Sequence, residues 1–158
     1  MKAFYAGSFD PFTNGHLYVL RQAAQIFDQV ILGIGQNPNK KRNFSAGKMK
    51  ELIEKVLKQE GLNNVSVVVY DGLTVKAAEN VQAHFLIRGL RNGVDYDYEE
   101  NLALINQDIS GLETIYFRAG DTAHVSASGV VQLWRGGVDV KKFVPEIVYR
   151  AILAPSLD

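Results

Sequence analysis

The strongest candidate for a chemical role lies close to the start of the chain. Residues 5–17 read "YAGSFDPFTNGHL", which places two glycines, an Asp-Pro turn and His16 between an apolar run and an amphipathic helical pattern. Thr13 or Asn14 can cap the helix whose first turn holds His16. The free amides and the positive dipole end of such a turn form a phosphate site, to which Ser8 adds a hydroxyl. Taken alone, His16 also fits a surface histidine beside an N-cap.

Two later loops carry groups that bind anions. The loop "QNPNKKRNF" at 36–44 places Lys40, followed by two more basic residues, on a segment stiffened by a proline. A solvated basic loop is the simpler interpretation of this run. The segment "RAGDTAHVSASG" at 118–129 can cap the next helix through Ser126, which provides a second dipole end with hydroxyls. Taken alone, this second segment is only an N-cap.

The loop "IRGLRNG" at 87–93 carries a sharper signal. Arg88 leaves an apolar strand, a glycine frees the backbone, and Arg91 follows three residues later. Two guanidinium groups beside a flexible backbone suit phosphate recognition. The alternative is that both arginines neutralise the acidic run that follows them.

This acidic run opens a helical pattern at 94–109 with two distinct stripes. Polar positions at offsets of four and seven form one stripe, and apolar positions form the neighbouring one. The first stripe contains Asp95, Glu99 and Asn106 with Leu102 on the same side, and the second contains Tyr98, Ile105 and Ile109. A solvated face is the default for a polar stripe, but one that starts so close to Arg91 can instead face a ligand cleft.

Composition limits the classes of protein to which the chain can belong. Its 158 residues, 47% of them hydrophobic, suit one compact domain over 1–158. Seventeen basic residues balance seventeen acidic ones, so we expect no nucleic acid and no membrane as partner. The chain has no cysteine, which excludes disulfides, zinc thiolate sites and thiol nucleophiles. Without a secretory segment or a long apolar run, a soluble cytoplasmic protein is expected.

Short β-branched or aromatic runs alternate with helical patterns along the chain, as in a repeated β-α-β unit. Apolar strands such as "VSVVVY" indicate a sheet covered on both faces. The sequence therefore predicts an α/β fold with a doubly wound, five-stranded parallel sheet of the Rossmann-like type, whose ligands bind beyond the carboxyl ends of the strands. The usual dinucleotide fingerprint and the P-loop motif are both absent from the sequence. The expected strands are 2–7, 29–35, 65–70, 84–89 and 114–117, and the expected helices are 14–27, 45–60, 73–82, 94–109, 126–135 and 144–153.

Four motifs together resemble those of a known family. "GSFDPFTNGH", "NPNKK", "IRGLRNGVDYDYE" and "HVSASG" occur in the order and at the spacings of bacterial phosphopantetheine adenylyltransferases, within the nucleotidyltransferase superfamily that carries a T/HxGH signature. The resemblance covers essentially the whole chain. It implies the Rossmann-like nucleotidyltransferase fold and Mg²⁺-dependent, reversible adenylyl transfer from ATP to 4'-phosphopantetheine by direct in-line attack, without a covalent intermediate. The products would be pyrophosphate and dephospho-coenzyme A (dephospho-CoA), in the penultimate step of coenzyme A (CoA) synthesis. The resemblance also implies a homohexamer with feedback inhibition by CoA.

This resemblance further implies a role for each matching position. Ser8 would bridge the two substrates, His16 would stabilise the transition state at the ATP phosphates, and Lys40 would hold the reacting phosphates. The implied catalytic set is Ser8, His16, Lys40 and Arg91. The implied ATP-binding set is Ser8, Phe9, His16, Gly89, Leu90, Arg91, Glu99, Thr122, Ala123, His124, Val125, Ser126, Ala127 and Ser128, and the implied acceptor-binding set is Ser8, Lys40, Thr74, Arg88, Leu102 and Asn106. The sequence does not indicate which residues contact magnesium.

One motif departs from the pattern of the family. The usual run reads I-S-S-S followed by a basic residue, whereas this chain has Ala127 between Ser126 and Ser128, and the next three residues carry no charge. A hydroxyl and a cation are therefore missing from the expected cradle for the β- and γ-phosphates. Arg118 and Arg135 are the candidates to replace that cation.

Two other functions are compatible with the residues alone. A non-catalytic nucleotide sensor on a similar sheet would need phosphate loops but not two anion sites. The basic groups His16, Lys40 and Arg88 follow three different strands and therefore favour an enzyme. Among enzymes, adenylyl or cytidylyl transfer to a different phosphate acceptor is the nearest alternative, and the fold by itself does not distinguish the acceptors.

Overall fold

In the part of the chain that the structure describes, five strands alternate with five α-helices, and a sixth α-helix follows the fifth without a strand between them. The structure is a computed structural model that describes residues 1–121, 124 and 126–154. Every expected strand and helix is confirmed, with bounds that differ by at most two residues. The elements are β1 (Lys2–Gly7), α1 (Asn14–Ile26), β2 (Gln29–Gln36), α2 (Ala46–Glu60), β3 (Val65–Asp71), α3 (Thr74–Asn80), β4 (Phe85–Leu90), α4 (Gly93–Ser110), β5 (Glu113–Arg118), α5 (Ala127–Arg135), the short 3-10 helix η2 (Lys141–Phe143) and α6 (Glu146–Leu153).

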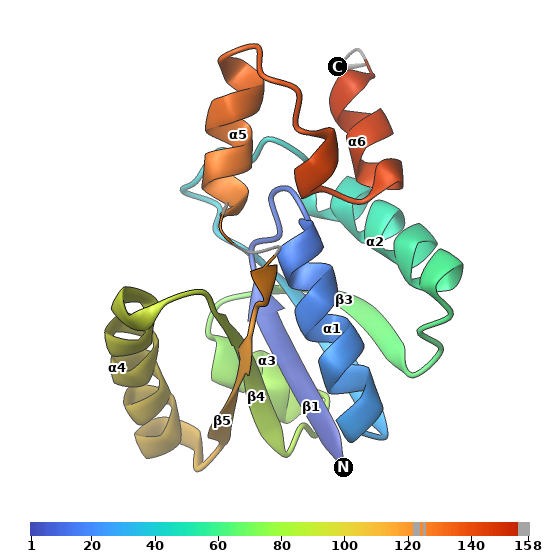
Figure 1. The fold of residues 1–158 in the computed structure, drawn as a ribbon. Helices are drawn as coiled ribbons and strands as arrows, with labels where there is room; N and C mark the ends of the chain where they lie inside the picture. The colour runs from blue at the N-terminus through green and yellow to red at the C-terminus, as the bar shows by residue number, and fades with distance from the viewer. Residues whose placement is uncertain (122–123, 125, 155–158) are drawn as a thin grey trace.

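The five strands lie parallel in one sheet with the order β3-β2-β1-β4-β5. The chain builds from β1 to β3, then crosses to the other side of β1 and continues to β5, so the strand order reverses between β1 and β4. α1 and α2 cover one face of the sheet and α3 and α4 the other, while α5 and α6 extend past the carboxyl ends of the strands (Figure 1). This doubly wound arrangement confirms the predicted fold class.

Both faces of the sheet are apolar because helices cover both of them. Phe4 of β1 packs on the α3 side, in a cluster with Val75. The next residue, Tyr5, belongs to the larger cluster on the opposite side, which also contains Leu20 of α1 and Ile53 of α2. Neighbouring residues of one strand thus enter opposite layers, as the twofold period of a strand requires.

The turn that follows β1 fixes where α1 begins. A side chain at Gly7 would meet the ring of Phe9 at 2.9 Å, and Phe9 itself has a left-handed backbone with a φ of 45°. A bulky residue in that conformation is uncommon, so the surrounding contacts must hold it there. Thr13 then caps the helix, since its hydroxyl accepts from the backbone N–H of His16 at 3.4 Å and its own N–H donates to the His16 ring at 3.0 Å. This capping box sets the first turn of α1 beside the end of β1.

α4 turns its polar stripe toward the sheet and its apolar stripe toward solvent. Glu99, on the predicted polar stripe, is only 9% exposed and is the buried residue of this helix. On the apolar stripe, Tyr98 is 65% exposed, and Ile105 and Ile109 are each 53% exposed. Of the two alternatives for the polar stripe, the structure therefore shows the one in which the stripe faces a cleft and not solvent.

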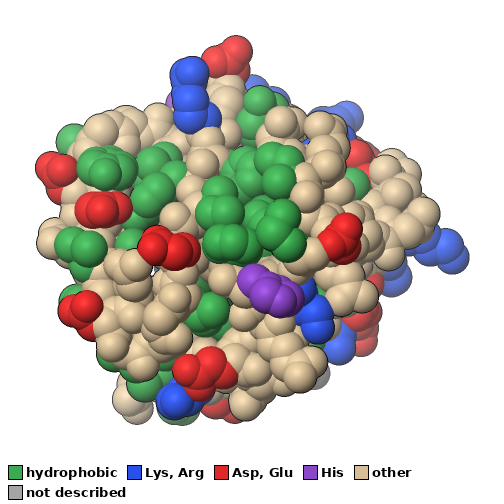
Figure 2. All heavy atoms as spheres, turned by 90° about the horizontal axis from the view of Figure 1, so that it is seen from below, with side chains coloured by type: hydrophobic (Ala, Val, Ile, Leu, Met, Phe, Trp, Pro, Cys, Tyr) green, Lys and Arg blue, Asp and Glu red, His purple; other side chains and the backbone are tan. Residues whose placement is uncertain are grey.

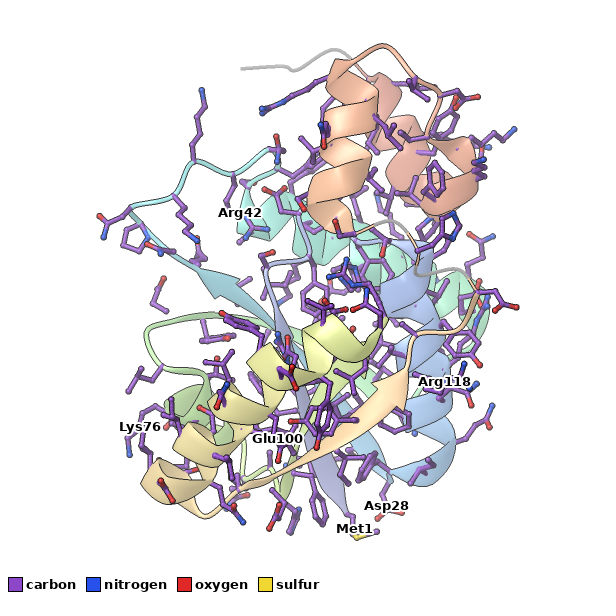
Figure 3. The ribbon with its side chains drawn as sticks, turned by 60° about the vertical axis from the view of Figure 1, so that its left-hand side comes forward. Met1, Asp28, Arg42, Lys76, Glu100 and Arg118 are labelled. Carbon is purple, nitrogen blue, oxygen red and sulfur yellow. The ribbon has the colours of Figure 1, made fainter. Side chains whose placement is uncertain are left out.

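Figure 2 looks onto the end of the sheet where the strands begin. Hydrophobic side chains gather near the middle of this end, and most of the charged groups in view lie around them. The ion pair between the amino group of Met1 and Asp28 also lies at this end (Figure 3). Among the described helices, none is both long enough and apolar enough to cross a membrane.

Candidate active site

A cavity of about 230 Å³ opens at the carboxyl ends of β1 and β4, where the strand order reverses. Doubly wound sheets bind their ligands at this position. The starts of α1 and α5 both contribute to its walls, and two helix N-termini at one cavity favour an anion. The cavity is lined by Tyr5, Ala6, Gly7, Ser8, Phe9, Thr13, Gly15, His16, Val19, Arg88, Gly89, Arg91, Glu99, Ala119, Ser126 and Ala127.

His16 enters this cavity as a neutral hydrogen-bond donor. Burial lowers the pKa of its imidazole to about 3, with help from the charges of Arg88 and Arg91. Its Nδ1 accepts a hydrogen bond from the backbone N–H of Thr13, and an accepting ring nitrogen carries no proton. The proton of the neutral ring therefore lies on Nε2. The ring of Phe12 stacks on the imidazole at 5.7 Å and that of Phe9 meets it edge-on at 4.9 Å, so the ring is held in one orientation.

Arg88 is fixed by a bidentate ion pair with Glu99. Nε of Arg88 lies 2.5 Å from Oε2 of Glu99, and Nη2 lies 2.6 Å from Oε1. The remaining nitrogen, Nη1, donates to the carbonyl of Ala6 at 2.9 Å. Three bonds fix the plane of the guanidinium, while one third of the Arg88 side chain stays exposed. The structure thus combines both interpretations of this arginine, since it neutralises the acidic run and also lines the cavity.

A second cavity, of about 130 Å³, shares the Arg88–Glu99 pair with the first. One wall comes from α4, and Thr74 at the start of α3 contributes a hydroxyl that is hydrogen-bonded to the hydroxyl of Tyr70 at 2.9 Å. Four of the residues implied for the acceptor therefore lie around one small space. The cavity is lined by Ala6, Thr74, Leu86, Ile87, Arg88, Glu99, Leu102, Ala103, Asn106 and Thr114.

Arg91 and Gly89 complete the β4 side of the first cavity. Nε and Nη2 of Arg91 lie 2.9 Å and 3.0 Å from the two carboxylate oxygens of Asp95, so this arginine is also paired with the acidic run. A side chain at Gly89 would meet Val19 of α1 at 3.0 Å, which explains why this position suits glycine. Leu90 lines neither cavity, and its carbonyl accepts from the N–H of Ala119 at 2.9 Å.

The start of α5 forms the opposite wall of the first cavity. Ser126 caps this helix by accepting from the N–H of Gly129 at 3.1 Å, and its hydroxyl lies 3.0 Å from that of Ser128. His124 is exposed, and its ring meets that of Phe143 at 5.7 Å. The predicted site residues Thr122, Ala123 and Val125 lie outside the described residues.

Neither candidate for the missing cation lines the cavity. Arg135, at the far end of α5, donates to the side-chain oxygen of Asn43 at 2.7 Å. Arg118 is exposed, and Figure 3 shows it on the side of the molecule that faces α1. The structure therefore does not support either arginine as the replacement.

Lys40 lies apart from both cavities. It is exposed on the loop that leaves the end of β2, and its backbone N–H closes a turn onto the carbonyl of Asn37 at 3.0 Å. Figure 3 shows this loop projecting away from the sheet. Ser8 is also exposed, but it lines the first cavity. A ligand would therefore contact Ser8 at once, whereas contact with Lys40 requires the loop to move or the ligand to extend toward it.

Sequence reasoning missed two polar groups in these cavities. Tyr5 lines the first cavity, and burial raises the pKa of its phenol, so its hydroxyl is a protonated donor. Thr114 lines the second cavity with a buried hydroxyl that has no hydrogen-bond partner among the described residues. Both lie within strands, where an apolar run hides a single polar position. The signal that could have found Tyr5 is its place two residues before the turn at Gly7.

Comparison with known proteins places the chain in a class. A family model described as cytidylyltransferase-like matches residues 4–133. Two solved structures share the fold: a bifunctional NMN adenylyltransferase/ADP ribose pyrophosphatase of Francisella tularensis (TM-score 0.72, 20% identity, 96% of this chain and 48% of that one) and the nicotinic acid mononucleotide adenylyltransferase of Plasmodium falciparum (TM-score 0.69, 14% identity, 96% and 94%). The chain thus has the fold of these nucleotidyltransferases and belongs to the cytidylyltransferase-like family.

Curated relatives narrow this class. The phosphopantetheine adenylyltransferase of Flavobacterium johnsoniae is 38% identical over 148 residues, which cover 93% of this chain and 96% of that protein. The phosphopantetheine adenylyltransferase of Allorhizobium ampelinum is 44% identical over 155 residues, covering 95% and 94%. The chain belongs to the phosphopantetheine adenylyltransferase family.

Proposed function

We propose that this protein catalyses the reversible transfer of the adenylyl group from ATP to 4'-phosphopantetheine, giving dephospho-CoA and pyrophosphate in the penultimate step of CoA biosynthesis. Membership of the family supports the reaction. The structural observation that carries it is the pair of cavities that meet at Arg88 and Glu99. One cavity offers two helix N-termini to a polyphosphate, and the other offers a narrow, mixed polar and apolar space to an elongated acceptor. An enzyme that joins two phosphorylated substrates needs two such sites side by side.

The proposed step needs no general base from the protein. A phosphate monoester is mostly doubly ionised at neutral pH, because its second pKa is about 6. An oxygen of the acceptor phosphate forms a bond to the α-phosphorus of ATP. The bond from that phosphorus to the bridging oxygen breaks, and pyrophosphate leaves with the electron pair. The protein must bring one anion against another and stabilise the charge of the transition state.

The geometry suggests how the residues divide this work. Nε2–H of His16 donates to the phosphates of ATP, and Arg88 receives the acceptor phosphate while Glu99 keeps the guanidinium plane fixed. Backbone amides at the start of α5 serve the β- and γ-phosphates. For ATP we propose the residues of the first cavity, with three more from the family resemblance: Ser8, Phe9, His16, Gly89, Arg91, Glu99, Ser126 and Ala127, and then Leu90, His124 and Ser128. For the acceptor we propose four residues of the second cavity, with two more from the resemblance: Thr74, Arg88, Leu102 and Asn106, and then Ser8 and Lys40.

Magnesium fits this site as a metal that arrives with ATP. Among the described residues, no three His, Asp or Glu side chains lie close enough together to hold a metal ion. Mg²⁺ commonly takes its oxygen ligands from substrate phosphates and water, with one or two carboxylates at most. Bound in that way, it neutralises part of the triphosphate charge. His16 and the amides at the start of α5 would then contact phosphate oxygens that are not bound to the ion.

We further propose that the protein is a homo-oligomer, a hexamer by its family, that it is inhibited by CoA, and that it works in the cytoplasm. The apolar stripe of α4 supports self-association, since Tyr98, Ile105 and Ile109 are more than half exposed. A row of apolar side chains on one helix is typical of a surface that another protein copy covers. CoA contains the pantetheine arm of the product, so it suits the same second cavity.

The test is pyrophosphate release by the purified protein with Mg²⁺-ATP and 4'-phosphopantetheine. Controls lack the acceptor or carry nicotinamide mononucleotide or glycerol 3-phosphate in its place. We expect release only with 4'-phosphopantetheine. Release with another acceptor would support adenylyl transfer but contradict 4'-phosphopantetheine as the acceptor. ATP binding without pyrophosphate release for any acceptor would favour a nucleotide sensor.

A further inference from the structure

Arg42 donates hydrogen bonds to three separate segments of the chain at the carboxyl ends of β1 and β2. Its Nη2 donates to the carbonyl of Ser8 at 2.7 Å, and its Nη1 donates to the carbonyl of Gly35 at 3.3 Å. Its Nε donates to the carbonyl of Phe44 at 2.9 Å. Figure 3 shows Arg42 at the base of the projecting loop, close to the start of α2. One side chain therefore joins the turn after β1, the end of β2 and the loop that carries Lys40.

Asp10 makes the reciprocal connection. Its carboxylate accepts from the backbone N–H of Asn43 at 2.7 Å and from the backbone N–H of Phe44 at 2.9 Å. The side-chain amide of Asn43 adds a third bond at 3.2 Å. Residues 8–10 and 42–44 are thus bound to each other in both directions, by a cation on one segment and an anion on the other.

The same three-residue segment, 42–44, also contacts α5. The side-chain oxygen of Asn43 accepts from Arg135 at 2.7 Å, and the ring of Phe44 stacks on that of Trp134 at 6.0 Å. The segment therefore touches the turn before His16, the loop with Lys40 and the helix that Ser126 begins. Arg135, which does not line the first cavity, makes its contact with this segment.

We propose that Arg42 is a positioning residue that ties the base of the Lys40 loop to the carbonyl of Ser8 and so keeps Lys40 within reach of the phosphates that Ser8 contacts. This inference rests on the proposed function, since Ser8 and Lys40 act on substrate only if that reaction is correct. Fixing the base of a loop in advance removes part of its ordering entropy from the binding step. A misplacement of about 1 Å in such a group lowers a reaction rate by about 100-fold.

The test compares Arg42→Gln with Lys41→Gln, which removes one positive charge from an exposed position in the same loop. For Arg42→Gln we expect kcat to fall by about tenfold or more, with KM for ATP and for 4'-phosphopantetheine within about threefold of wild type. Hydrogen exchange at the amides of Asn43 and Phe44 should accelerate in the same variant. Lys41→Gln should change none of these quantities by more than about twofold. Arg42→Lys should restore part of kcat, because a lysine reaches one carbonyl but not three.

Two results would overturn the positioning role. An unchanged kcat in Arg42→Gln shows that the loop needs no such anchor, and a raised KM for ATP with kcat unchanged shows that Arg42 binds phosphate directly. If wild type releases no pyrophosphate with any acceptor, the proposed function fails. Hydrogen exchange at the amides of Asn43 and Phe44 then tests by itself whether Arg42 anchors the segment. Equal exchange in wild type and in Arg42→Gln would refute the anchoring.

Discussion

At the residue scale, the environment of His16 keeps its imidazole neutral, with a single N–H that can donate to an anion. A protonated imidazole would suffer from burial and from the charges of Arg88 and Arg91, which together lower its pKa to about 3. The capping bond from Thr13 then decides which nitrogen keeps the proton of the neutral ring. The hydrogen bond that caps the start of α1 therefore also orients the Nε2–H donor of His16, so local structure and chemistry depend on the same contact.

We predict that His16→Ala lowers kcat by about 100- to 1000-fold, the range for losing one preorganised donor to a transition state. The fold should persist, because Thr13 still caps α1 through its hydroxyl. Steady-state kinetics with both substrates saturating measures the effect. His84→Ala is the matched control, since His84 precedes β4 and its Nδ1 accepts from Lys2 away from both cavities. An unchanged kcat in His16→Ala would remove this histidine from the chemistry.

The low pKa of His16 also links stability to pH. Between its ordinary value of 6.5 and the folded value of about 3, the unfolded chain binds a proton that the folded protein does not. Stability therefore falls as the pH is lowered through this window, by up to about 1.4 kcal/mol per pH unit from this group. We predict that His16→Gln removes this component. Urea unfolding of both proteins from pH 7 to pH 4 should show a shallower slope for the variant, and parallel slopes would contradict the low pKa.

At the scale of elements, the Arg88–Glu99 pair joins β4 to α4 and so fixes that helix over the second cavity. We predict that Glu99→Gln lowers the free energy of unfolding by about 1.5–3 kcal/mol, the range for a hydrogen bond to a charged group. It should also raise KM for the acceptor more than KM for ATP, because Arg88 loses its fixed plane. Asp97→Asn, at an exposed position of the same helix, serves as the control. Equal stability of the Glu99 variant and the control would show that the pair does not hold α4.

Periodicity was enough to predict the elements, because strands and helices depend on local patterns. The twofold period of β1 and the cap before His16 are both readable within a few residues. The sequence did not show which face of α4 is buried, because the apolar stripe of this helix points to solvent and its buried residue is a carboxylate. Whether Glu99 forms its ion pair with Arg88 or with Arg91 depends on how α4 packs against β4.

Contacts distant in sequence escaped prediction for the same reason. Asp10 and Asn43 are 33 residues apart, and only the pairing of β1 with β2 brings their loops together. The sequence therefore predicted which strand ends carry chemistry, but not how those ends are fastened to one another.

At the scale of the whole molecule, the outward stripe of α4 predicts association. Ile105→Glu should shift the protein toward the monomer, weakening assembly by at least about tenfold, because an unpaired carboxylate resists burial in an apolar interface. Sedimentation velocity across a range of concentrations measures the change. Val138→Glu, at a half-exposed apolar position away from α4, is the control and should leave the assembly intact. Monomeric wild type, or a variant that assembles as well as wild type, would contradict a contact through this stripe.

Three residues, Ala6, Arg88 and Glu99, line both cavities, and the two charged side chains among them form an ion pair. Any ligand that pulls Arg88 or Glu99 toward its own side changes the space and the charge that the other ligand meets. Because both cavities share these side chains, a ligand in one cavity changes the affinity of the other cavity for its own ligand. Thermodynamic linkage requires this effect to be mutual. By whatever factor the acceptor changes the affinity for the nucleotide, the nucleotide changes the affinity for the acceptor.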